Sequence, residues 1–380
     1  MKVAVHDSIS AIPARDWNAL AGTAYPFLDH AFLELAERTG SVSPDAGWTP
    51  RHLTLEDSGR LRAAMPLYEK SHSWGEFVFD WAWARAYEQA GLDYYPKLVS
   101  AVPFTPAPST RLLRADPNDE EAAERLLSAA TTLARDTGCS SMHILFPGED
   151  ELPALERQGL LIRKDCQFHW YNRGYESFDD FLATFTSAKR KKARRDRRRV
   201  AEAGISFRRL RGAEMDTGHW AVVYALIART FMLRGSLPYF NQAFFEGLSA
   251  RLGDNLLVIQ AEKDDQPIAA AVFFESDTAL YGRYWGSDGH YDALHFETCY
   301  YQGIDYCIET RKQRFEPGTQ GEHKVARGFV PTTTWSAHWL AHPEFAGAIE
   351  RYVDEEGRHI DRYMDAVDAH TPYKSGGDSG

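Results

Sequence analysis

The sequence of 380 residues has little cysteine and no long apolar segment. Its four cysteines are dispersed and include no CxxC pair, so the sequence predicts neither a disulfide framework nor a zinc site. They are Cys139, Cys166, Cys299 and Cys307. No run of about 18 apolar residues occurs, which argues against a membrane-spanning helix. The N-terminus lacks the apolar core of a signal peptide, and these absences together predict a cytoplasmic location.

A metal-binding motif is also missing. His338 and His342 have the i,i+4 spacing of two ligands on one helix face. No HExxH motif accompanies them, and Pro343 follows at once. The sequence therefore predicts no metal site.

Charge is abundant but unevenly placed. The net charge is −11 and the pI is about 5.7, which argues against a general nucleic-acid coating protein. Residues 189–199 nevertheless hold nine Lys or Arg and one Asp. This run either packs on acidic surface or binds a polyanion, such as a tRNA backbone or an anionic membrane surface, in a salt-dependent way. The candidate polyanion-binding residues are Lys192, Arg194, Arg195, Arg197 and Arg198.

Two segments 206 positions apart resemble each other. Residues 53–68 and 259–274 each read as a strand, a short polar turn and a returning strand. Apolar residues make up 44% of the chain, ample for two cores. A repeat of domain length predicts two copies of one α/β unit. We expect a first unit at 1–163, a second at 164–370 and a polar, disordered tail at 371–380.

The remaining pattern predicts the elements around these hairpins. The expected helices are 31–39, 120–137 with Asp119 as N-cap, 178–203, 219–234, one capped by Asp292 and running to 310, and 343–369. The expected strands are an aromatic strand end at 77–83, then 142–146, 168–172, a three-stranded meander over 256–285, 313–316 and 332–338.

Six stretches of the sequence resemble one known group. They are residues 75–84 (GEFVFDWAWA), 94–98 (YYPKL), 102–106 (VPFTP), 282–286 (GRYWG), 295–297 (HFE) and 320–329 (QGEHKVARGF). These stretches are similar to those of the bacterial FemAB-like group, labelled peptidoglycan biosynthesis/recognition. The order of sheet, meander and helix also resembles the GNAT acyltransferase unit. The resemblance spans nearly the whole chain.

The resemblance implies a fold of two tandem GNAT-like units, each a mixed β-sheet flanked by helices. It implies transfer of an acyl or aminoacyl group to an amine. The donor stays open between acyl-coenzyme A and aminoacyl-tRNA. The acceptor stays open between a small amine or amino acid and a peptidoglycan precursor. A protein that binds cell-wall precursors without chemistry is the remaining alternative.

The loop at 286–292 departs from the ordinary GNAT pattern. GNAT enzymes hold the coenzyme A pyrophosphate on backbone N–H groups at a helix N-terminus. Here the loop carries Asp288 and Asp292, which repel a pyrophosphate. The sequence therefore disfavours coenzyme A at this place.

The charged loop at 320–329 carries the candidate catalytic groups. Lys324 lies where the Fem ligases place a lysine ahead of a Gly-Phe pair, and a fixed cation there would stabilise an oxyanion or hold a phosphate. Arg327 would clamp phosphate. Glu322 and His323 are candidate general bases for the attacking amine. The alternative is a solvated connection in which Lys324 pairs with Glu322.

Other candidate substrate-binding residues lie outside this loop. Strand alternation places Arg283 and Trp285 on one face, a pair suited to a carboxylate or phosphate. His295 and Glu297 begin a helix and point to different faces, so we expect at most one at the cleft and His295 to cap or pack. In the first unit an acidic-aromatic cluster either receives an amine or forms a buried core. Its members are Glu76, Asp80, Trp81 and Trp83.

Overall fold

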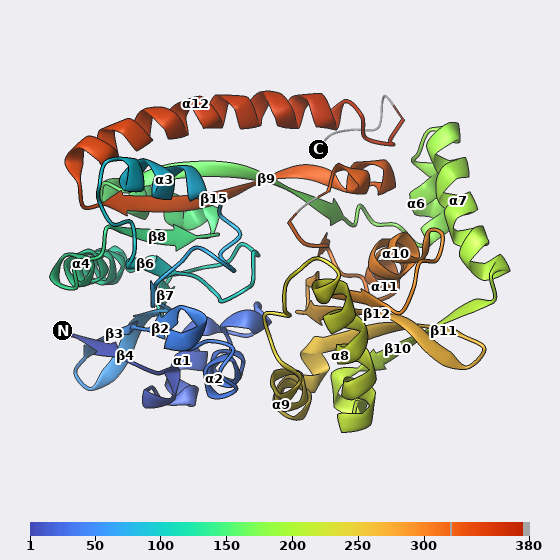
Figure 1. Cartoon of the computed structure of the whole chain (residues 1–380), viewed down its shortest axis with the longest axis horizontal. Helices are drawn as coiled ribbons and strands as arrows, with labels where there is room; N and C mark the ends of the chain where they lie inside the picture. The colour runs from blue at the N-terminus through green and yellow to red at the C-terminus, as the bar shows by residue number, and fades with distance from the viewer. Residues whose placement is uncertain (320, 375–380) are drawn as a thin grey trace. The chain divides into compact units, whose positions relative to one another are not determined.

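The computed structural model describes residues 1–319 and 321–374, and the chain divides into two compact units (Figure 1). Unit 1 comprises Met1–Cys166 and Thr333–Arg362, and unit 2 comprises Gln167–Thr332 and the residues from Tyr363 on. The division therefore differs from the expected second unit at 164–370, because Thr333–Arg362 returns to unit 1. The reason is strand pairing: the end of β15 (Val330–Leu340) pairs with β8 (Ser141–Leu145).

Unit 1 contains two sheets. The first has the antiparallel order β1-β3-β4-β7, and the second has the order β15-β8-β6-β5-β2 with β6 and β8 parallel. Their strands are β1 (Lys2–His6), β2 (Trp48–Pro50), β3 (His52–Asp57), β4 (Arg60–Met65), β5 (Tyr68–Lys70), β6 (Lys97–Ser100) and β7 (Leu113–Arg114). The helices are α1 (Ala14–Ala21), α2 (His30–Arg38), α3 (Trp81–Gln89), α4 (Glu120–Asp136), α5 (Leu152–Arg157) and the long α12 (Pro343–Asp368), which continues into unit 2.

Helix α4 is the central packing element of unit 1. Its predicted cap is confirmed, since the Asp119 side chain accepts a hydrogen bond from the Ala122 N–H at 3.0 Å. Leu126 and Leu127 are fully buried in one apolar cluster with residues of both sheets, such as Met65 and Met142. A helix with one apolar face thus joins the two sheets into one core.

Unit 2 is built on one sheet with the order β10-β11-β12-β13-β14-β9. Its strands are β9 (Leu161–Tyr171), β10 (Ile205–Arg211), β11 (Leu256–Lys263), β12 (Gln266–Glu275), β13 (Ala279–Ser287) and β14 (Arg314–Glu316). The predicted meander is confirmed as β11, β12 and β13. The helices are α6 (Phe178–Ala183), α7 (Ser187–Glu202), α8 (Thr217–Met232), α9 (Gln242–Leu252), α10 (Leu294–Phe296), a π-helix (Glu297–Tyr301), α11 (Gln302–Glu309) and the 3-10 helix η8 (Glu322–Arg327).

The hairpins of the two units share fine detail. The β3–β4 ladder shifts register between Leu55 and Glu56, and the β11–β12 ladder shifts between Ala261 and Glu262, 206 positions later. Their two-residue turns also match: both central residues have positive φ, as a type I′ turn requires. The turn residues are Ser58 and Gly59 in unit 1, and Asp264 and Asp265 in unit 2. A shared bulge and turn support duplication of one ancestral unit.

The predicted helix at 178–203 is wrong, because two helices, α6 and α7, occupy it. Between them Phe185 is fully buried and forms a β-bridge with Tyr373. The Thr186 N–H donates to the Pro372 carbonyl at 2.8 Å, which ends the helical ladder. The same contacts correct the expected disordered tail as far as Lys374, whereas 375–380 lie outside the described residues.

Three further elements differ from expectation. The stretch 77–83 is not a strand, since Phe77 has φ 61° and α3 begins at Trp81. Asp292 does not cap a helix: it pairs with Arg199 at 2.7 Å, and α10 starts after Ala293, whose φ is 63°. The loop expected at 320–329 contains the 3-10 helix η8. Among the described helices, none has the length and apolar composition needed to cross a membrane.

Candidate functional site

A cavity of about 110 Å³ lies in unit 2 between the β12–β13 hairpin and the π-helix. Its lining includes Arg283, Trp285, His295, Cys299, Tyr300 and Gly318. Arg283 and Trp285 both line it, consistent with the strand face predicted for them. A π-helical turn is rare and often found where side chains are placed for function. This cavity is the first candidate site.

Lys324 is the buried amine beside this cavity. Two glycines with positive φ, Gly321 at 113° and Gly328 at 93°, bracket the tight helix η8 that carries it. Its Nζ donates to the Gly318 carbonyl at 2.6 Å. Burial, reinforced by the charge of Arg283, lowers the pKa of Lys324 to about 7. Lys324 therefore changes charge near neutral pH and does not pair with Glu322.

The imidazoles near the cavity are held in the neutral form. Burial lowers the pKa of His295 to about 4, and its ring contacts Trp285 edge-on. His295 therefore packs on Trp285, as expected, and also lines the cavity. His323 is more exposed, its Nε2 lies 2.8 Å from the Tyr300 hydroxyl, and partial burial also lowers its pKa. Glu322 is exposed and accepts a hydrogen bond from Tyr363 at 3.0 Å.

Arg327 is committed to the protein itself. Its guanidinium stacks 3.3 Å from the Phe296 ring centroid, and Nη1 donates to the His323 carbonyl at 2.6 Å. Nη2 lies 3.5 Å from the buried Asp196 carboxylate of α7. These contacts tie η8 to α7, so the predicted phosphate clamp at Arg327 does not fit the structure.

Glu297 and Arg197 form a second tie to α7. Glu297 is buried, and its carboxylate lies 3.1 Å from Arg197 and accepts from Gln302 at 2.8 Å. Burial, moderated by Arg197, raises the pKa of Glu297. Glu297 thus faces α7 while His295 faces the cavity, which confirms that the two lie on different faces. Arg197 also pairs with Asp305 at 2.7 Å, so this candidate polyanion contact is engaged by two carboxylates of unit 2.

The outer face of α7 remains strongly basic. Lys191, Lys192, Arg194, Arg195 and Arg198 are exposed. Arg194 pairs with Asp179 at 2.8 Å and Arg198 lies 3.7 Å from Glu202, both in exposed positions that contribute little. Lys192 and Arg195 have no ion pair with any described residue. Helix α7 is therefore two-faced, with inner ion pairs to the site and an outer cationic surface.

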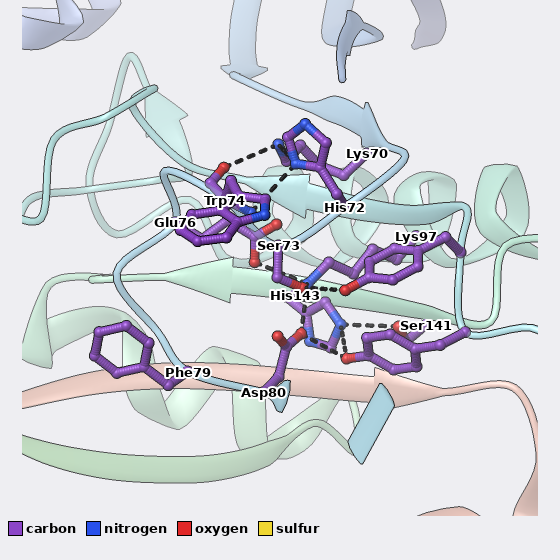
Figure 2. A network of polar contacts seen from close by, with 12 residues as sticks. Lys70, His72, Ser73, Trp74, Glu76, Phe79, Asp80, Lys97, Ser141 and His143 are labelled. Carbon is purple, nitrogen blue, oxygen red and sulfur yellow. Dashed lines mark hydrogen bonds and ion pairs between the residues drawn. The ribbon is translucent and has the colours of Figure 1, made fainter. Parts of the chain in front are cut away.

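Unit 1 contains a buried polar network (Figure 2). Lys97 is fully buried, and its Nζ donates to Glu76 at 2.8 Å, to Ser73 at 2.8 Å and to Asp80. Tyr94 donates to Asp80 at 2.6 Å. Burial opposes the charge on each group, but the two carboxylates raise the pKa of Lys97 and the ammonium holds that of Asp80 well below its usual range. Burial raises the pKa of Glu76 to about 7.

This network continues through two neutral imidazoles. The Tyr94 hydroxyl lies 3.2 Å from His143 Nε2, and His143 Nδ1 lies 2.6 Å from His338 Nδ1. Burial lowers the pKa of His143 to about 3 and that of His338 well below its usual range. Ser336 lies 2.8 Å from His338 Nε2 and ends the chain of contacts.

The unit 1 cluster predicted to receive an amine already holds one, the ammonium of Lys97. Glu76 and Asp80 are its partners. Trp81 is half-buried at the start of α3, and Trp83 is buried with its ring 4.8 Å from that of His338. The cluster is thus a buried ion-pair network, closer to the predicted core alternative.

Sequence reasoning missed several members of both clusters. In unit 1 these are Lys97, Tyr94 and His143, although 94–98 was among the stretches that carried the resemblance. In unit 2, Tyr300 was overlooked. Nothing in the spacing of these residues links them, because each pair is joined only by tertiary packing.

The loop 286–292 occupies the place where GNAT enzymes hold the coenzyme A pyrophosphate. The Asp288 N–H donates to the Ile268 carbonyl at 2.9 Å, and the Gly289 N–H faces Ser287 Oγ at 3.4 Å. The N–H groups of Asp288 and Gly289 are therefore engaged by the chain itself, and Asp288 adds negative charge. These residues do not fit a pyrophosphate.

Two α/β units, each with a mixed sheet flanked by helices, define a fold of two tandem GNAT-like units. The chain belongs to the FemAB-like family, described as peptidoglycan biosynthesis/recognition, whose model matches residues 8–375. No curated protein matches the chain.

Solved structures confirm the fold. FemX is 12% identical, with a TM-score of 0.55, covering 92% of this chain and 100% of its own. The C-terminal domain of a putative lysylphosphatidylglycerol synthetase from Agrobacterium fabrum is 9% identical, with a TM-score of 0.54, covering 91% and 94%. L-PGS from Bacillus licheniformis is 11% identical, with a TM-score of 0.50, covering 84% and 95%. At such identities the likeness concerns the fold alone.

Proposed function

We propose that the protein transfers an aminoacyl group to an amine of a peptidoglycan precursor, and that the unit 2 cavity is the site. One observation carries the proposal: a buried lysine with a pKa near 7 adjoins a cavity lined by Arg283, Trp285 and His295. Family membership and the FemX-like fold support this reaction class. Perturbed pKa values in a cleft favour a functional role over a structural one.

In the proposed reaction the acceptor amine attacks the carbonyl carbon of the donor. A C–N bond forms, the ester C–O bond of the aminoacyl donor breaks, and a negative oxygen develops between these steps. Protonated Lys324 stabilises that oxygen. His323 takes the proton from the amine and returns it to the leaving hydroxyl. Glu322 is the weaker candidate base, because its carboxylate is engaged by Tyr363.

The proposal also specifies the donor of the aminoacyl group. The loop at 286–292 has two engaged N–H groups and two aspartates, which favours aminoacyl-tRNA over acyl-coenzyme A as the donor. The outer face of α7 supplies exposed cations for an RNA backbone. Its inner face holds η8 and the π-helix through Asp196 and Arg197, so α7 adjoins the site.

Single-turnover transfer tests the reaction. The protein is mixed with labelled aminoacyl-tRNA or labelled acyl-coenzyme A, together with a peptidoglycan precursor carrying a free amine. We expect label on the amine only with aminoacyl-tRNA. Transfer only from acyl-coenzyme A would overturn the donor assignment, and precursor binding without transfer from either donor would overturn the reaction.

Charge reversal on α7 tests the donor surface. A triple variant, Lys191→Glu, Lys192→Glu and Arg195→Glu, is expected to weaken tRNA binding at least ~10-fold, because phosphate contacts dominate such affinity. The slope of log K against log salt should fall by about 2, since three phosphate contacts disappear. Filter binding at several salt concentrations measures both.

The matched control reverses three exposed arginines of unit 1: Arg15→Glu, Arg60→Glu and Arg85→Glu. This control changes net charge equally and should leave the salt slope nearly unchanged. Equal loss in both variants would show that only net charge matters and would remove α7 as the donor surface.

A further inference from the structure

A segment of unit 2 is free of acidic residues. Residues 217–245 contain no Asp or Glu, although the chain has 54 of them. The charged residues in this segment are Arg229 and Arg234, with His219 at its start. The segment forms α8, the following loop and the first residues of α9. A local positive charge thus stands out on an acidic protein.

The same segment carries the most exposed apolar side chains. Leu233 is 78% exposed and Leu237 is 74% exposed, more than any other large apolar side chain in the described chain. Met232 at 59% and Val222 at 42% extend the surface along α8. We name these four residues the α8 apolar edge. Helix α8 contributes Val223, Leu226 and Ile227 to the core, so the exposed residues are not needed for the core of unit 2.

We propose that the α8 apolar edge docks on an anionic lipid bilayer. Leucine side chains at a helix end gain by entering the interface between headgroups and acyl chains. Arg229 and Arg234 add attraction to anionic headgroups, and the segment has no carboxylate to oppose it. A second copy fits this surface less well, because a symmetric contact would bring the two arginine pairs together without acidic partners.

The α8 apolar edge lies on and just after a helix that packs on β13, the strand that carries Arg283 and Trp285. Helix α8 packs on β13 so closely that a Cβ at Gly286 would lie 2.1 Å from the Leu226 carbonyl carbon. Burial is the main cause of the lowered pKa of His295, and the charge of Arg234 contributes after those of His323 and Arg327. The inference itself rests on exposure and charge and does not depend on the proposed reaction.

Co-sedimentation with vesicles tests the proposal. The full chain is mixed with vesicles of phosphatidylcholine containing about 30 mol % phosphatidylglycerol, or of phosphatidylcholine alone. We expect binding to the mixed vesicles and at least ~10-fold weaker binding by the double variant Leu233→Ser and Leu237→Ser. Both side chains are exposed, so the variant should keep the wild-type melting temperature.

Two controls make the result specific. Val5→Ser with Leu92→Ser, at 47% and 40% exposure in unit 1, should bind like wild type. The triple charge reversal on α7 leaves Arg229 and Arg234 in place and should lose less of the binding than the leucine variant. No wild-type binding, equal binding by the leucine variant, or loss in the α7 variant alone would each overturn the proposal. A dimer abolished by the leucine variant, without vesicle binding, would assign the edge to self-association instead.

Discussion

Replacing Lys324 by alanine is expected to lower kcat for amine acylation about 10²–10³-fold, the usual cost of removing one oxyanion donor. KM should change much less, because the lysine acts on charge that develops in the transition state. Steady-state kinetics with saturating donor and acceptor measure both constants. Lys263→Ala, at the β11–β12 turn of the same unit, is the matched control and should retain activity.

The pH profile separates the proposed roles at this site. With His323 as base and protonated Lys324 as cation, kcat rises as His323 loses its proton below pH 6.5 and falls as Lys324 loses its proton near pH 7. Lys324→Arg should keep part of the activity and shift the alkaline limb upward, because arginine stays charged. An unchanged alkaline limb in that variant would remove Lys324 from the mechanism.

Stability gives an independent readout for Lys324. Its folded pKa lies below its unfolded value of 10.5, so the protonated form opposes folding. This penalty is full below about pH 7 and disappears as the pH rises toward 10.5. Lys324→Met should therefore melt ~3 °C higher than wild type at pH 6, with little difference near pH 10. A gain in stability with a loss of turnover is typical of a functional group.

The second large effect is expected in unit 1. Lys97→Met should destabilise this unit by about 3–5 kcal/mol, because it leaves Glu76 and Asp80 buried without their cation. Hydrogen exchange of the intact chain reads the two units separately, and the loss of protection should concentrate in β6 and β8. The Asp80 contribution is present above its unfolded pKa of 3.8 and is lost as the pH falls toward its depressed folded pKa.

A compensating variant makes this second result interpretable. Adding Glu76→Gln and Asp80→Asn to Lys97→Met removes the uncompensated charge and should recover much of the stability. Asn18→Ala with Arg15→Ala on α1, away from the network, gives a matched control. If the triple variant is as unstable as Lys97→Met alone, the penalty comes from lost packing and hydrogen bonds, not from unpaired carboxylates.

Local pattern was enough to predict much of the fold. The cap at Asp119, the meander β11–β13 and the repeated hairpin all rest on short-range chemistry: an N-cap carboxylate, period-two alternation and turn residues. Prediction failed where contacts between residues far apart in the sequence determine the backbone conformation. Helix α6 ends because Phe185 pairs with Tyr373, nearly 190 positions away. No local sequence pattern predicts such a bridge.

The candidate site likewise has features that the sequence predicts and features that it does not. The stretches around Lys324, Arg283 and His295 could be identified from the sequence. The first is a charged segment between two glycines, and the others contain aromatic residues beside a charged one. The roles of the individual residues could not be predicted. Arg327 and Arg197 looked like ligand contacts, yet both are engaged by carboxylates from other elements.

By itself the sequence determined the family, the duplicated α/β unit and the placement of charge along the chain, because these follow from residue order and composition. Only the tertiary structure decided which charges are buried and paired. It placed Lys324 next to a cavity and left Leu233 and Leu237 exposed. It also showed that the unit 1 cluster predicted to bind an amine ligand binds the ammonium group of Lys97. Burial and pairing depend on what lies close in space, and that distance is set by packing between elements far apart in the chain.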